Sequence, residues 1–91
     1  MTKKFDALLR VFFKDNVNEP TRAEIQRKIS RAGFENVKVT RTGKCLDLRL
    51  RATVRLTARL SIKRMCKKLL VHPLLEDYSI ESIDPVEELF S

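Results

Sequence analysis

The sequence contains few of the residues that metal sites, disulfides and phosphate loops require. Its 91 residues include two cysteines, one histidine, two glycines and no tryptophan. Cys45 and Cys66 stand too far apart, with too few other ligands, for a zinc site, so we expect both to be buried free thiols. The glycines have neither G-x-G-x-x-G nor Walker spacing, which excludes a glycine-rich phosphate loop.

Long apolar runs are also missing. No stretch approaches the roughly 18 apolar residues that a membrane-spanning helix needs. The lysines at the N-terminus, within residues 1–6, are not followed by the apolar region of a signal peptide. We therefore predict a cytosolic protein that does not contact the membrane.

Catalytic constellations are equally scarce. His72, beside a proline at the predicted end of a helix, is more typical of a residue near a helix C-cap than of a general base. Cys66 falls on the apolar face of that helix, where a core thiol is the simpler interpretation than a nucleophile. We predict no catalytic, cofactor-binding or metal-ligating residue.

The composition is that of a small globular protein, with 43% hydrophobic and 34% charged residues. The length predicts a single domain over residues 1–91. A chain of this size buries only about 60–65% of the surface that its unfolded form exposes, so a lone monomer is marginally stable. Self-association, as a dimer or a tetramer, is the expected remedy.

The net charge of +7 is distributed unevenly. Residues 41–68 carry ten basic side chains and one acidic side chain, whereas residues 69–91 carry six acidic side chains and no Lys or Arg. This asymmetry fits a basic surface for nucleic acid or for an acidic partner. It fits equally well a solvated helix face beside an oppositely charged neighbour.

In the first half of the chain, the pattern predicts a strand over 5–13 and a helix over about 21–32. Thr21 and Glu24 have the spacing of a capping box. The apolar stripe of the helix falls on Ile25, Ile29 and Ala32, and Gly33 supplies a left-handed stop.

In the second half, alternation predicts a strand at 37–39 and a half-buried strand over 46–50, joined as a hairpin. Residues 51–56 are ambiguous between a strand and a connection. A second helix extends from 57 to the proline at 73, and a last strand covers 78–83. The apolar face of this helix is expected at the following residues: Ala58, Ile62, Met65, Cys66, Leu69 and Leu70.

These elements predict an α+β fold of order β-α-β-β-α-β, an antiparallel sheet covered by two helices. After the last strand, residues 84–85 are expected to begin a short tail turn carrying Leu89 and Phe90.

The segment Arg41-Thr42-Gly43-Lys44 is the one polar constellation of interest. Two basic residues that flank a tight turn can hold a phosphate or a carboxylate. A solvated hairpin is the alternative. We expect Gly43 to adopt a positive φ in this turn.

The predicted topology is shared by RNA recognition motifs and by regulatory ligand-sensing modules of the ACT type. An RNA recognition motif stacks bases on aromatics of its central strands, and the strand over 44–50 has none. The first strand offers only Phe12 and Phe13. Basic charge alone allows non-specific phosphate binding, so a basic nucleic-acid-binding module is the alternative function. The ACT interpretation rests on fold analogy alone.

Three segments carry a resemblance to one family. Residues 65–80 read Met-Cys-x-x-Leu-Leu-x-His-Pro-x-x-Glu-Asp-Tyr-x-Ile, residues 32–37 contain Gly-Phe-x-x-Val, and residues 41–44 read Arg-x-Gly-Lys. This series resembles the PurS subunit of phosphoribosylformylglycinamidine synthase, in which asparagine is usual at the position of His72. Pro20 matches a proline in a loop of that family. Residues 51–64 depart most, since they are basic where family members tend to be acidic.

The resemblance implies a non-catalytic adaptor that forms a homodimer or a tetramer. It implies that the partners are a glutaminase subunit, which releases ammonia from glutamine, and an ATP-dependent synthetase subunit of purine biosynthesis. It also makes Pro20, Arg41, Gly43 and Lys44 the candidate partner-contact residues.

Overall fold

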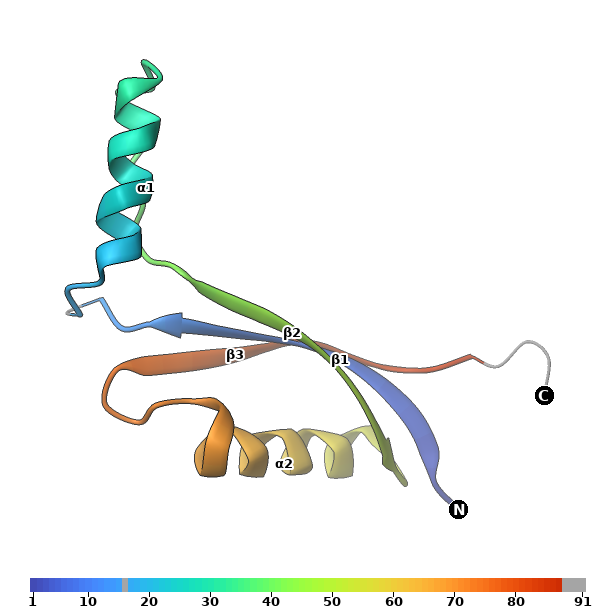
Figure 1. Cartoon of the computed structure of the whole chain (residues 1–91). Helices are drawn as coiled ribbons and strands as arrows, with labels where there is room; N and C mark the ends of the chain where they lie inside the picture. Colours follow the sequence, from blue (N-terminus) through green and yellow to red (C-terminus); the bar gives the residue numbers. More distant parts are fainter. Residues whose placement is uncertain (16, 88–91) are drawn as a thin grey trace.

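The computed structural model describes residues 1–15 and 17–87. Its elements, in chain order, are β1 (Lys3–Phe13), α1 (Pro20–Arg31), β2 (Gly43–Ala52), α2 (Arg55–Met65), the π-helical turn η1 (Cys66–Leu70) and β3 (Glu76–Pro85). The three strands form one antiparallel sheet of order β2-β1-β3 (Figure 1). The α+β class and the antiparallel sheet are confirmed.

The core lies between the sheet and α2, which crosses one face of the sheet (Figure 1). Strand residues alternate, so β1 turns every second side chain toward the helix. The residues that form this core are Phe5, Ala7, Leu9, Val11, Ala52, Ala58, Ile62, Cys66 and Ile83. Leu46, Leu48 and Leu50 pack against it half-buried, as the alternation of β2 predicts.

The expectation for Leu69 is wrong. Ala58, Ile62 and Cys66 are buried, but Leu69 is 73% exposed. The reason is that α2 continues into η1, and one π-helical turn rotates later residues away from the stripe that a 3.6-residue period predicts. The expectation for Cys45 is also wrong, because it lies on the exposed side of β2; both cysteines are free thiols.

The strand predicted at 37–39, and with it the hairpin, is not formed, so the order is β-α-β-α-β. Gln26 of α1 explains why. Its amide nitrogen donates to the carbonyl of Val37 at 2.9 Å, and its amide oxygen accepts from the N–H of Val39 at 2.7 Å. The side chain therefore takes the backbone groups that a neighbouring strand would have used, and Arg22 holds the carbonyl of Thr40 in the same way.

Helix α1 does not cover the sheet, contrary to the prediction. It stands beyond one end of the sheet (Figure 1), and none of its residues is buried. The radius of gyration is 17.2 Å, whereas a compact chain of this length has a radius of about 12 Å. The fold of a single chain is therefore extended, with α1 as its outlying part.

The remaining boundaries agree closely with the pattern. The ambiguous residues 51–56 divide between the end of β2 and the start of α2, with a bend between them. Residues 84–85 belong to β3, and the tail carrying Leu89 and Phe90 lies outside the described residues. Among the described residues, no helix is long and apolar enough to cross a membrane.

Candidate partner-contact site

The candidate residues meet at one junction, where β1 ends and α1 and β2 begin. The link is Glu19, which is buried and comes directly before Pro20. The hydroxyl of Thr42 donates to the Glu19 carboxylate at 2.6 Å. The backbone N–H of Phe13 also donates to the carbonyl of Thr42 at 3.1 Å. Pro20 and the segment Arg41–Lys44 are thereby held side by side.

Glu19 is the N-cap of α1, which corrects the capping box predicted from Thr21 and Glu24. Its carboxylate accepts hydrogen bonds from the N–H groups of Thr21 and Arg22, both at 2.8 Å. Pro20 then occupies the first turn, where its missing N–H costs nothing. A glutamate is an uncommon cap, so the sequence pattern placed the N-cap two residues too late, at Thr21.

The electrostatics of Glu19 follow from these bonds. The Thr42 hydroxyl is the largest cause, and with the N–H groups of Thr21 and Arg22 it lowers the pKa of Glu19 from 4.5 to about 2. Desolvation opposes this shift. The charged carboxylate is therefore the form that holds the junction together.

Acid should consequently weaken the junction. Because the folded pKa is depressed, the stabilisation from Glu19 is present above pH 4.5 and is lost as the pH falls toward about 2. We expect Glu19→Gln to lower the melting midpoint at neutral pH and to reduce its fall between these two values. Thermal melts at fixed protein concentration measure both effects. The control is Glu24→Gln, which changes an exposed glutamate of α1. An identical acid profile for wild type and Glu19→Gln would contradict the stabilising role of the charged Glu19 carboxylate.

Gly43 is required for a different reason from the one predicted. Gly33 has a positive φ, of 95°, as expected, and Gly43 does not. Gly43 instead pairs with Phe12 in the sheet. A Cβ on Gly43 would meet the carbonyl oxygen of Val11 and would come within 2.7 Å of the Phe12 Cα. The backbone approach, not the conformation, excludes a side chain here.

Arg41 and Lys44 do not converge on one anion. The guanidinium of Arg41 lies 4.6 Å from the centroid of the Phe12 ring and 3.8 Å from the Asp15 carboxylate. Phe12 belongs to the sheet face opposite α2, whereas Lys44 shares the parity of Leu46, which faces α2. They present two separate basic contacts at one edge of the junction. Sequence reasoning missed Asp15, Phe12 and Glu19, because the partners of a charged side chain depend on the tertiary fold.

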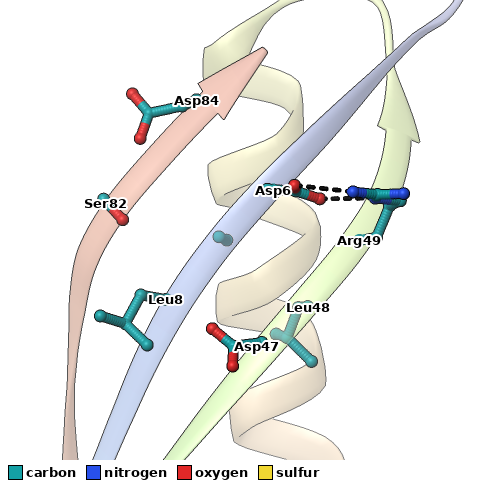
Figure 2. A pocket seen from close by; sticks show the side chains of 8 residues that line it. Asp6, Leu8, Asp47, Leu48, Arg49, Ser82 and Asp84 are labelled. Atoms are coloured by element: carbon teal, nitrogen blue, oxygen red, sulfur yellow. Dashed lines mark hydrogen bonds and ion pairs between the residues drawn. The ribbon is translucent and has the colours of Figure 1, made fainter. Parts of the chain in front are cut away.

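The sheet face opposite α2 is open, and we call it the open face. A shallow concavity of about 460 Å³ lies on it, lined by Asp6, Leu8, Asp47, Arg49, Ser82 and Asp84. Figure 2 shows Asp6 of β1 reaching across to Arg49 of β2, with hydrogen bonds of 2.7 and 2.9 Å. The bond from Arg49 lowers the pKa of Asp6.

The open face does not suit base stacking. Phe12 is its one aromatic side chain among the described strand residues. Its ring already contacts the guanidinium groups of Arg10, at 4.8 Å, and Arg41. An RNA recognition motif needs free rings at this place.

His72 has a structural role. Its Nδ1 accepts hydrogen bonds from the N–H groups of Leu74, at 3.2 Å, and Leu75, at 3.3 Å. Its own backbone N–H donates to the Glu76 carboxylate at 2.9 Å. The histidine therefore shapes the turn after η1. This agrees with the prediction that His72, beside a proline, lies near the end of the helix.

Comparison with known proteins agrees with this geometry. Residues 6–84 match the model of the family described as PurS, phosphoribosylformylglycinamidine (FGAM) synthase. The chain belongs to the PurS family. The PurS subunit of phosphoribosylformylglycinamidine synthase from Methanocaldococcus jannaschii is 32% identical over 77 residues, which cover 85% of this chain and 93% of that protein.

Solved PurS structures share the fold. The crystal structure of the M. jannaschii PurS superimposes with a TM-score of 0.76 at 31% identity, covering 91% of this chain and 99% of that chain. A chain in the structure of PurLQS from Thermotoga maritima gives a TM-score of 0.75 at 28% identity, covering 91% and 98%. The resemblance inferred from residues 65–80 is confirmed.

Proposed function

We propose that this chain is the non-catalytic small subunit of phosphoribosylformylglycinamidine synthase, which joins a glutaminase subunit to an ATP-dependent synthetase subunit in purine biosynthesis. The main support for this proposal is the family match over residues 6–84, together with the similarity to a chain of the T. maritima PurLQS structure. The proposal treats residues 1–91 as one PurS-like domain. It places the protein in the cytoplasm, where free thiols such as Cys45 and Cys66 persist.

The proposal includes self-association as a homodimer. Ile25 and Ile29 form an apolar stripe on α1, and no described element of the same chain buries this helix. Phe34 and Val37, just beyond α1, are 61% and 45% exposed. An amphipathic helix of a folded protein normally packs its stripe on a partner surface. A two-fold contact supplies such a surface for both copies at once.

Co-purification tests the subunit role. A tagged chain expressed with the glutaminase and synthetase subunits of the same organism should retain both through size-exclusion chromatography. Recovery of the chain alone, under conditions where both partners are folded, would reject the proposal.

The same assay tests the junction as a partner contact. Arg41 and Lys44 are exposed, so replacing both with alanine should change stability by no more than about 0.5 kcal/mol for each residue. Retention of the partners should fall much further if the junction docks on them. Unchanged retention and turnover in the double variant would show that the segment 41–44 is a solvated surface and not a partner contact. The matched control is Arg27→Ala with Lys28→Ala, two exposed cations on α1.

A further inference from the structure

A groove lies between the end of β2 and the helical segment formed by α2 and η1, which together supply its lining. Its volume is about 350 Å³. The apolar part of its lining consists of Leu50, Met65 and Leu69. The basic part consists of Arg51, Arg64 and Lys68. We call it the α2 groove.

The cations of the α2 groove have no counter-ion within residues 1–15 and 17–87. Among the described residues, Arg51, Arg64 and Lys68 make no ion pair and no side-chain hydrogen bond. None of the described residues that line the groove is acidic. Three positive charges beside apolar surface create a positive electrostatic potential that attracts an acidic ligand.

The apolar lining of the α2 groove is exposed because the helix changes from α to π geometry at η1. The π-helical turn η1 moves Leu69 out of the buried stripe of α2 and onto the groove, where it is 73% exposed. Leu60, one helical turn before Arg64, is 52% exposed. Leucines that are interleaved with cations in this way indicate a contact with a protein chain, because phosphate backbones require cations but no apolar surface.

We propose that the α2 groove binds an acidic amphipathic segment of a partner subunit, with apolar side chains on Leu50, Met65 and Leu69 and carboxylates on the three cations. This inference rests on the proposed subunit role and names a contact surface within it. A helix or an extended strand with acidic residues flanking leucine-type side chains has the required chemistry. The groove also lies where residues 51–64 are basic, so the partner's segment is expected to be acidic in the same organism.

Charge reversal on the groove provides the test. The variant Arg64→Glu, Lys68→Glu changes two groove cations, and Lys63→Glu, Lys67→Glu changes two exposed lysines of the same helical segment that do not line it. Both variants have equal net charge and equal spacing. We expect the groove variant to weaken binding to the purified partner subunits by at least about tenfold, and the control by less than about threefold. Leu69→Gln, which alters an exposed side chain, should weaken binding by about fivefold with an unchanged melting midpoint.

Each outcome decides one point. If the wild-type chain binds neither partner subunit, the proposed function fails, and with it this inference. If wild type binds and the groove variant equals the control, the inference alone is overturned. If the groove variant, measured without partner subunits, differs from wild type in molar mass, the groove is assigned to a second copy of this chain. Loss of RNA binding at physiological salt with partner binding intact would assign it to nucleic acid. Both of the last two results overturn the proposal.

Discussion

Omission of this chain from a reconstituted synthase should remove glutamine-dependent turnover and leave ammonia-dependent turnover nearly intact. The two residues weighed as a base and a nucleophile have structural positions: His72 holds a turn, and Cys66 is buried with a pKa raised by desolvation. Under the proposed function, its contribution is to hold the subunits together, so that ammonia released by one reaches the other. Linking two binding modules raises the overall avidity by about 10²–10⁴ over either single affinity. We therefore expect at least about a 100-fold loss with glutamine and less than about a threefold loss with added ammonium.

The assay compares two nitrogen donors at fixed concentrations of the glutaminase and synthetase subunits. Adding the chain back should restore glutamine use in proportion to the amount added, until the chain reaches a fixed ratio to the other subunits. An adaptor behaves in this way and a catalyst does not. Glutaminase activity measured alone is the control for subunit quality. An equal loss with both donors would show that the chain acts on the synthetase reaction itself, and this would contradict a coupling role.

Local patterns in the sequence predict most of the fold. The alternation in β1 and β2 places Leu9 and Leu48 on the α2 side of the sheet, because a two-residue period leaves no other choice when one face is covered. Gly33 ends α1 with a positive φ because few other residues adopt one. These features depend on neighbours in sequence, so a single chain reveals them.

The errors arise where a distant side chain competes with the local pattern, or where the helix changes its type. Val37 and Val39 have strand propensity, yet Gln26 captures their backbone groups from α1. Leu69 has the spacing of a core residue, yet η1 inserts an extra residue into the helical turn. Neither event leaves a periodic signal: in the first, strand propensity yields to a tertiary contact, and in the second, a change of helix type shifts the helical period.

The candidate site shows the same division. The segment 41–44 was found from its two basic residues and Pro20 from the family resemblance, and the structure brings them together through Glu19 and Thr42. The predicted turn geometry was wrong, since Gly43 begins a strand and Arg41 and Lys44 take opposite faces of it. Their role toward a partner stays a prediction.

The dimer is expected to depend on α1. The stripe of Ile25 and Ile29 is only half-buried within the chain, and an aspartate at position 29 would place a charge in the contact that the proposed dimer buries. Losing a buried isoleucine costs about 1.5–3 kcal/mol, and desolvating a carboxylate adds more. Because 1.4 kcal/mol is a factor of ten, Ile29→Asp should raise the dimer dissociation constant by at least about 100-fold.

Light scattering over a range of micromolar concentrations measures this change. Ser30→Asp is the matched control: it introduces the same charge one residue later, on an exposed position away from the stripe. Both aspartates lie near the C-terminal end of α1, so they share any unfavourable interaction with the helix dipole. Only the variant at position 29 also alters the apolar contact. A difference between the two variants therefore measures burial of the stripe by another copy. A wild-type chain that is monomeric throughout this range, or two variants that dissociate alike, would show that α1 is not the dimer contact.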